Sequence, residues 1–136
     1  METRHLTAII ETTENNYGAY LEDVGGLGGI GKTIAEVKAS LLDAIDFLID
    51  FSKENGYEIP EELQGDYVID FRMDVKSFLS VYSGILTKAG LERLTGINQK
   101  QLWHYANGKT VPRRAQIQKI ENALHQLGSE LLSIRL

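Results

Sequence analysis

Apolar and polar positions alternate in short runs over the first part of the chain, and turn-forming residues separate these runs. Residues 5–11 (HLTAIIE) and 17–21 (YGAYL) predict two strands. Residues 12–16 (TTENN) predict the turn of a hairpin between them, because Asn and Thr side chains bond to nearby backbone groups. Residues 24–31 are rich in glycine and predict a loop rather than a regular helix. Residues 67–71 alternate again and predict another strand.

A long amphipathic helix is predicted between the glycine-rich loop and that last strand. Thr33 and Glu36 have the spacing of a capping box, in which each side chain accepts a hydrogen bond from the first turn. Asn55-Gly56 predicts the helix end, and residues 57–66, with one proline and three glutamates, predict an exposed connection. The apolar positions that recur at helical steps, and can cover one face of a sheet, are Ile34, Val37, Leu41, Ala44, Ile45 and Leu48.

The apolar period becomes helical at Asp74 and stays helical to the end of the chain. This change predicts an α+β fold, in which a β-hairpin/helix/strand domain at residues 1–72 precedes an all-α domain at residues 74–136. Four helices are expected: one capped by Asp74, one from about Thr87 to Thr95, one from Asn98 to Asn107-Gly108, and one after Pro112 with Ile117, Ile120, Leu124, Leu127 and Leu131 on one face.

Residues 87–110 (TKAGLERLTGINQKQLWHYANGKT) have the spacing of a helix-turn-helix. Gly96 suits the left-handed backbone of the turn. Residues 98–107 would form the recognition helix, with its N-terminal end in the major groove of duplex DNA. The side chains expected to face inward and fix the angle between the two helices are Leu91, Ile97, Leu102 and Tyr105.

Candidate DNA contacts lie on the outer face of the recognition helix and just after it. We expect Gln99, Lys100 and His104, with Gln101 beside them, to contact base edges, because Gln bonds to adenine and Lys to guanine. Trp103 is expected to pack on a neighbouring helix or a second subunit. The side chains expected to contact the DNA backbone, without reading sequence, are Asn107, Lys109, Thr110, Arg113 and Arg114.

The two parts of the chain carry opposite charge. Residues 1–84 contain six basic and sixteen acidic residues, a net charge of −10, whereas residues 85–136 contain eight basic and three acidic residues, a net charge of +5. A basic segment attracts polyphosphate, and an acidic segment repels it and attracts basic proteins. The asymmetry therefore predicts different electrostatic partners for the two parts.

The composition argues against several classes of function. The chain has no cysteine, which excludes a disulfide framework and a thiolate metal site, and His5 and His125 are too isolated to suggest a metal. No apolar run is long enough to span a bilayer, and the N-terminus lacks a signal-peptide pattern. We therefore expect a cytoplasmic protein without membrane contact, catalytic residues or cofactor.

Residues 26–33 (GLGGIGKT) match the phosphate-binding pattern G-x-x-x-x-G-K-[ST], and residues 26–31 also match G-x-G-x-x-G. In that interpretation Lys32 neutralises phosphates and Thr33 holds Mg²⁺. The residues before the loop end in two acids, and no later apolar strand ends in an Asp suited to the metal. A nucleotide-binding enzyme is therefore the less favoured alternative, and whether this loop binds a phosphate ligand stays open.

Residues 86–127 resemble the helix-turn-helix family of phage repressors. The matched stretch is LERLTGINQKQLWHYANGKTVP, with the turn glycine at Gly96 and the Asn-Gly-Lys loop at residues 107–109. The resemblance implies a homodimer that reads two half-sites about one helical turn apart, and a higher homo-oligomer is the alternative. Glu92 departs from the small alanine that this family usually packs between the helices, so either it extends outward or the helices cross differently.

Residues 4–72 are similar to the HicB-type antitoxin domain of type II toxin–antitoxin systems. The similarity rests on LTAIIE, YGAYLEDV and the helix start at Gly31, Thr33 and Glu36, while residues 23–26 (DVGG) replace the usual acid-Leu-Pro-Gly stretch. It implies a partial RNase H-like fold without a catalytic role, and a small, basic, RNA-cleaving HicA-like toxin as partner. The expected toxin contacts are Glu22, Asp23, Leu27 and Ile30.

These observations predict an antitoxin that blocks a toxin through its acidic domain and represses its own operon by binding operator DNA. One alternative is a stand-alone repressor whose N-terminal domain senses a small ligand. Another is a four-helix packing module that does not bind DNA.

Overall fold

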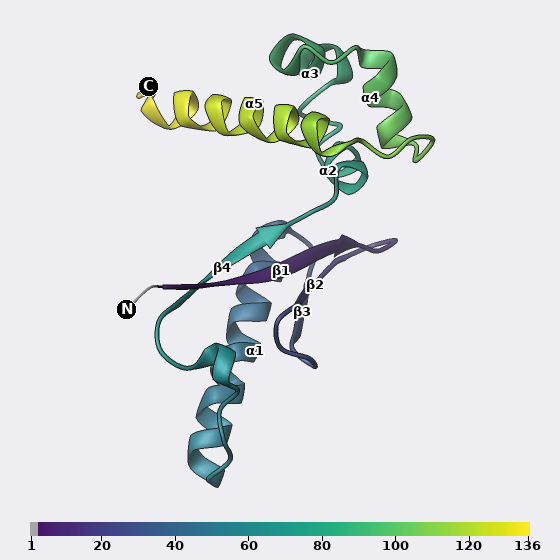
Figure 1. Ribbon diagram of the computed structural model, residues 1–136. Helices are drawn as coiled ribbons and strands as arrows, with labels where there is room; N and C mark the ends of the chain where they lie inside the picture. The colour runs from purple at the N-terminus through teal and green to yellow at the C-terminus, as the bar shows by residue number, and fades with distance from the viewer. Residues whose placement is uncertain (1–2) are drawn as a thin grey trace. The chain divides into compact units, whose positions relative to one another are not determined.

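The computed structural model describes residues 3–136 and divides the chain into two compact units, Met1–Met73 and Asp74–Leu136. The first unit is a four-stranded sheet with one long helix, and the second is built of four helices (Figure 1). The expected α+β class is therefore confirmed.

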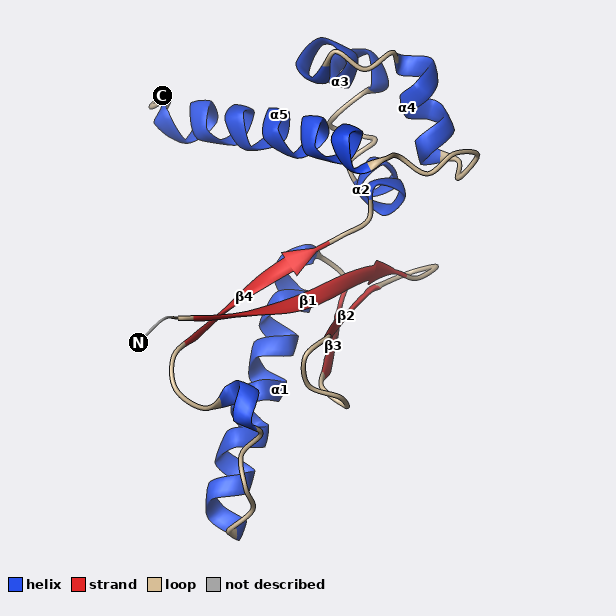
Figure 2. Cartoon of the chain, viewed as in Figure 1, coloured by secondary structure: helices blue, strands red, loops and turns tan. Residues whose placement is uncertain are grey.

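The sheet of the first unit has the strand order β3-β2-β1-β4. β1 pairs antiparallel with β2 and parallel with β4, and β2 pairs antiparallel with β3 (Figure 2). The predicted hairpin and the predicted later strand are confirmed. The elements in chain order are β1 (Arg4–Thr12), β2 (Tyr17–Leu21), β3 (Gly28–Gly31), α1 (Ile34–Asn55), a short 3-10 helix (Glu61–Leu63) and β4 (Tyr67–Arg72).

Helix α1 covers one face of this sheet, as its apolar stripe predicts. Val37, Leu41 and Ile45 are at most 1% exposed. Because side chains alternate across a strand, the other face of the sheet stays open to solvent. The strand residues that α1 buries are Leu6, Ala8, Ile10, Ala19 and Leu21.

The predicted capping box begins α1, with one difference in its bonding. Thr33 Oγ1 accepts from the Glu36 N–H at 3.1 Å, as expected for the N-cap. The Glu36 carboxylate accepts from the N–H of Lys32, at 2.8 Å, rather than from Thr33. Gly56 ends the helix in the left-handed conformation, with φ 69°.

The glycine-rich segment is not a loop throughout, because residues 28–31 form the edge strand β3. A Cβ added to Gly29 would lie 2.5 Å from the backbone nitrogen of Leu41, and one added to Gly31 would lie 2.6 Å from that of Val37. The strand crosses α1 so closely that only glycine fits at these two positions. The expectation of a loop was wrong here because these glycines permit close approach rather than irregular backbone.

The second unit contains the four predicted helices. Asp74 accepts from the Ser77 N–H at 2.6 Å, and Thr87 Oγ1 accepts from the Gly90 N–H at 3.0 Å, so both act as N-caps. The core side chains are Leu79, Leu91, Ile97, Leu102, Tyr105 and Ile120. The helices are α2 (Val75–Val81), α3 (Lys88–Thr95), α4 (Gln99–Ala106) and α5 (Arg114–Ser133).

None of the helices within residues 3–136 has both the length and the apolar character that crossing a bilayer requires.

Candidate nucleic-acid interface

Helices α3 and α4 form the predicted helix-turn-helix, with Gly96 at the turn. Gly96 has φ 77°, and its N–H donates to the carbonyl of Glu92 at 2.8 Å. The Thr95 hydroxyl accepts from the Ile97 N–H at 3.0 Å and so fixes the residue that follows the turn glycine. The four side chains expected to face inward are all buried, at 5% exposure or less: Leu91, Ile97, Leu102 and Tyr105.

Glu92 stands where the phage-repressor family usually has a small alanine, and it caps the N-terminus of α4. Its carboxylate accepts from the backbone N–H of Gln99 at 3.2 Å and from the side-chain amide of Gln99 at 3.4 Å. Asn98 Oδ1 accepts from the Lys100 N–H at 2.8 Å. A negative charge beside the first N–H groups of a helix also interacts favourably with the helix dipole. Glu92 therefore fixes both the start of α4 and the direction of the Gln99 side chain.

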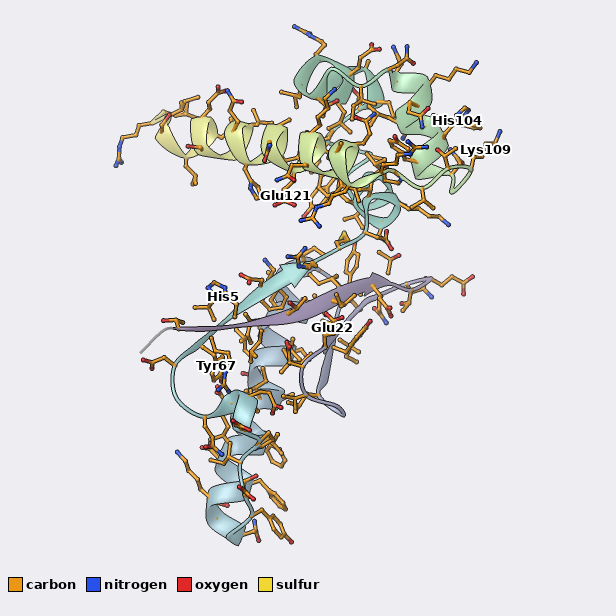
Figure 3. The ribbon with its side chains drawn as sticks, viewed as in Figure 1. His5, Glu22, Tyr67, His104, Lys109 and Glu121 are labelled. Atoms are coloured by element: carbon orange, nitrogen blue, oxygen red, sulfur yellow. The ribbon has the colours of Figure 1, made fainter. Side chains whose placement is uncertain are left out.

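The residues expected to contact bases differ in the exposure of their side chains and in whether those side chains are already hydrogen-bonded within the unit. Gln99 and Lys100 are exposed at the N-terminal end of α4, where such a helix meets base edges. His104, half-buried, lies on the outer side of α4, close to Lys109 in the following loop (Figure 3). Gln101 is also half-buried, and its amide donates to Thr110 Oγ1 at 3.2 Å, so it holds the following loop.

The loop after α4 carries most of the residues expected at the DNA backbone. Arg113 and Arg114 are exposed at the start of α5. The Asn107 side chain donates to the carbonyl of Trp103 at 2.8 Å and so closes the C-terminus of α4. Lys109 places its ammonium 4.6 Å from the centre of the Trp103 ring.

Two residues join this surface that the sequence did not assign to it. Trp103 is 43% exposed and its ring lies under the Lys109 ammonium, so within the unit it does not pack on a neighbouring helix, and the expected contact with a second subunit stays a prediction. Lys76 of α2 has its ammonium 3.3 Å from where a Cβ on Gly108 would lie. Lys76 is far from α4 in the sequence, so no local pattern could have found it.

The second unit as a whole is basic. Residues 74–136 contain nine basic and four acidic residues, a net charge of +5. Of the four acids, Asp74 and Glu92 are engaged as helix caps. The surface formed by α4 and the loop after it can therefore offer amide and ammonium donors to bases and cationic side chains to phosphates.

The first unit presents its open sheet face and the β2–β3 turn as a separate candidate surface. Glu22 is exposed, and Ile30 is 74% exposed. The Asp23 carboxylate accepts from the Thr7 N–H at 2.7 Å and anchors the turn. Leu27 belongs to the buried core, so the expectation that its side chain contacts a partner was wrong: it supports the turn from inside.

A shallow hollow lies on the same face, where two strand glycines leave space between larger side chains. Its volume is about 380 Å³, and Glu11, Tyr20 and Ile30 border it. Gly18 pairs with Ile30, and Gly28 pairs with Tyr20, across the β2–β3 ladder. The hollow combines one carboxylate with two exposed apolar side chains, a pattern suited to a basic, partly apolar partner.

The first unit owes its negative charge to carboxylates spread over its surface. Residues 1–73 contain five basic and fifteen acidic residues, a net charge of −10. Burial, and then the nearby Asp46 carboxylate, raise the pKa of the Tyr67 hydroxyl above its ordinary value of 10.0, so Tyr67 stays neutral at physiological pH. On the exposed surface of β1 and β4, His5 Nδ1 lies 3.0 Å from an Asp70 carboxylate oxygen.

The phosphate-binding interpretation of residues 26–33 conflicts with the bonding of this segment. The Lys32 N–H, which would face a phosphate, donates to the Glu36 carboxylate. The Ile30 N–H donates to Ser40 Oγ at 3.0 Å, and Gly28–Gly31 pair with β2 as a strand. An anion at this helix start would meet a carboxylate that already occupies the N–H groups.

Among proteins of known sequence, the chain is similar to a UPF0150 protein of Synechocystis sp. The two are 44% identical over 59 residues, which is 42% of this chain and 82% of that protein. The match therefore spans most of the relative but less than half of the present chain. No protein-family profile matches the chain, and no solved structure matches it.

Proposed function

The chain belongs to the UPF0150 family, which is the HicB-like family, and from this we propose that it is an antitoxin that represses its own operon. The acidic first unit binds a small, basic, RNA-cleaving toxin. The basic second unit binds operator DNA as part of a homodimer. In this account one chain joins a protein-binding unit to a DNA-binding unit of opposite charge.

The DNA-binding part of this proposal rests on one observation: α4 buries its inner face and exposes its N-terminal end. Its inner face is fixed by buried Leu102 and Tyr105, while Gln99 and Lys100 project from its exposed N-terminal end. A recognition helix needs this combination, because base contacts require side chains held in a defined direction on a rigid element. Lys109, Arg113 and Arg114 supply phosphate contacts that set the register on the duplex.

The toxin-binding half rests on family membership and on charge. The net charge of −10 on residues 1–73 attracts a basic protein to this unit, and the acidic surface competes with RNA for that protein. Glu22, with Ile30 and Tyr20 beside the hollow, provides a carboxylate next to apolar side chains that contribute burial. We assign the toxin contact to this surface and not to the outer face of α1.

Co-expression with the small open reading frame next to the gene tests the toxin-binding half. We expect the two products to co-purify and the chain to relieve the toxicity of its partner. Glu22→Lys should weaken the complex at least about tenfold, since it turns an attraction into a repulsion.

Asp50→Lys is the matched control, because it makes the same charge change at an exposed position of α1. It should leave affinity near the wild-type value. A neighbouring product that is harmless, or that fails to co-purify, contradicts the antitoxin role, and equal effects of both variants contradict the assigned surface.

The alternative of a ligand-sensing repressor receives little support from the described residues. The hollow at Glu11, Tyr20 and Ile30 is open to solvent and has a single charged side chain in its lining. Small-ligand sites are concave and bury most of the surface of their ligand, which a shallow and open hollow does not do.

A further inference from the structure

The loop that follows α4 is fixed to the end of that helix by hydrogen bonds. Gly108 is left-handed, with φ 72°, and its N–H donates to the carbonyl of Tyr105 at 3.2 Å. The Lys109 N–H donates to the carbonyl of His104 at 3.0 Å. Two side-chain hydrogen bonds hold both ends of the loop. Because the N–H groups of Gly108 and Lys109 are already bonded, an anion at this loop must be held by side chains.

Two ammonium groups lie at this fixed loop. Lys76 of α2 has its ammonium 3.3 Å from where a Cβ on Gly108 would lie, and α2 packs against α4, which brings it there. Lys109, the next residue after Gly108, has its ammonium 4.6 Å from the centre of the Trp103 ring. Within residues 3–136, neither ammonium forms an ion pair with a carboxylate. Two positive charges beside one glycine, without a negative partner, favour the binding of an anion.

We propose that Lys76 and Lys109 together bind one phosphate of the DNA backbone beside Gly108. Trp103 is the positioning residue that holds Lys109 toward this phosphate. The inference rests on the proposed function, because duplex DNA supplies the phosphate. It extends the DNA contact from the helix-turn-helix to α2, a helix outside that motif.

Trp103 limits the directions open to Lys109. A lysine side chain is a flexible stem with a compact charge, and ordering it on binding costs entropy. The face of an aromatic ring attracts an ammonium, so part of that ordering precedes the arrival of DNA. Trp103 is itself 43% exposed, so it holds the ammonium at the surface, where the charge can still meet a phosphate.

A purely structural role for Lys76 predicts a different result. Its ammonium lies near the C-terminal end of α4, where a positive charge also interacts favourably with the helix dipole. Loss of a dipole contact lowers the unfolding temperature and does not involve DNA. Loss of a phosphate contact lowers the salt dependence of DNA binding. The two roles are therefore separated by measuring both quantities on the same variants.

Salt-dependent binding of the full chain to the DNA upstream of its gene tests the site. Lys76→Gln and Lys109→Gln combined should lower the slope of log affinity against log salt by about 1, since each neutralised phosphate contributes about 0.9. Each single variant should lower it by less, because the other lysine still meets the same phosphate. Lys119→Gln combined with Arg135→Gln is the matched control: it also removes two exposed positive charges, and its slope should stay near the wild-type value.

Three results overturn the shared phosphate site. The first is a wild-type slope in the double variant, with or without a lower unfolding temperature. The second is a slope lowered by about 2, which means that the two lysines contact separate phosphates. The third is an equal change in the control.

Substitutions of Trp103 test its positioning role. Trp103→Leu should weaken DNA binding several-fold at an unchanged salt slope, because both ammonium groups stay charged but Lys109 is no longer held. Trp103→Phe keeps a ring under the ammonium and should retain most of the affinity. Wild-type affinity in Trp103→Leu, or an equal loss in Trp103→Phe, overturns this role.

The fluorescence of Trp103 tests the site without DNA, because it is the only tryptophan of the chain. Titration of the full chain with pyrophosphate at constant ionic strength should change the emission saturably, and the double lysine variant should lose that change. Emission that does not respond to pyrophosphate, or that responds equally in the double variant, overturns the site. A chain that responds to pyrophosphate but binds no DNA would contradict the proposed function and leave the phosphate site standing.

Discussion

Gly29 and Gly31 hold β3 against α1 because neither residue has a Cβ. The backbone of Gly29 lies so near Leu41 that an added Cβ would come within 2.5 Å of a backbone nitrogen. Backbone on a packed helix cannot move aside as a flexible side chain can. The edge strand that carries Ile30, and hence the candidate toxin surface, depends on these two residues.

Gly29→Ala should therefore destabilise the first unit by about 1–3 kcal/mol, the cost of an overpacked site. Gly25→Ala is the control, since a Cβ at Gly25 meets nothing within 4 Å, and its change should stay within about 0.5 kcal/mol. Urea denaturation of both variants measures the difference. A Gly29→Ala protein as stable as the wild type would mean that β3 does not approach α1 this closely.

At the scale of elements, α4 depends on a residue of the preceding helix. Glu92 of α3 satisfies the first N–H of α4 and bonds to the side chain of Gln99. The two helices are thus joined by a polar contact in addition to their buried core. The direction of Gln99, and so its value for base contact, depends on that carboxylate.

Glu92→Ala should lower the stability of the second unit by about 0.5–2 kcal/mol, the usual cost of losing a helix cap. It should also reduce preference for operator over unrelated DNA, because Gln99 is no longer held. Thermal unfolding and competition gel shifts measure the two effects. Glu130→Ala, at an exposed position of α5, is the control for removing one acid; a Glu92→Ala protein that matches it in both assays would contradict this role.

Much of the element order was predictable from periodicity, because each α-helix and three of the strands follow their own apolar pattern, whereas the 3-10 helix at Glu61–Leu63 lies where an exposed connection was expected. The stripe of α1 and the N-caps at Thr33, Asp74 and Thr87 are local signals. β3 could not be predicted, since its glycines are explained by the approach of α1 and not by neighbouring residues. The same limit applies to Glu92, because its role as a cap of α4 depends on a contact with Gln99 on the next helix and not on its own helix.

The candidate sites were less predictable than the fold. Exposure of Gln99 and Lys100 followed from the spacing of buried Leu102 and Tyr105. The burial of Leu27 depends on how the β2–β3 turn folds back onto the core, which sequence spacing does not specify. The proximity of Lys76 to Gly108 is a tertiary contact without a local signature.

At the scale of the whole molecule, the charge division coincides with the structural division. The unit of residues 1–73 has a net charge of −10, and the unit of residues 74–136 has a net charge of +5. Under the proposed function, the acidic unit opposes nonspecific contact between the basic unit and phosphates. Specific contacts at α4, doubled by the proposed dimerisation, would then be needed to hold the chain on an operator.

The most direct test of the central claim is a titration of the DNA upstream of the gene with the full chain, followed by fluorescence anisotropy at several salt concentrations. We predict sequence-preferring binding that weakens linearly in log affinity against log salt. Gln99→Ala and Lys100→Ala should each cost about 1–3 kcal/mol and relax sequence preference, while Arg113→Ala should weaken all sequences alike and lower the salt slope by about 1. If the wild type does not bind at low salt, or if all three variants bind as it does, α4 is not a recognition helix.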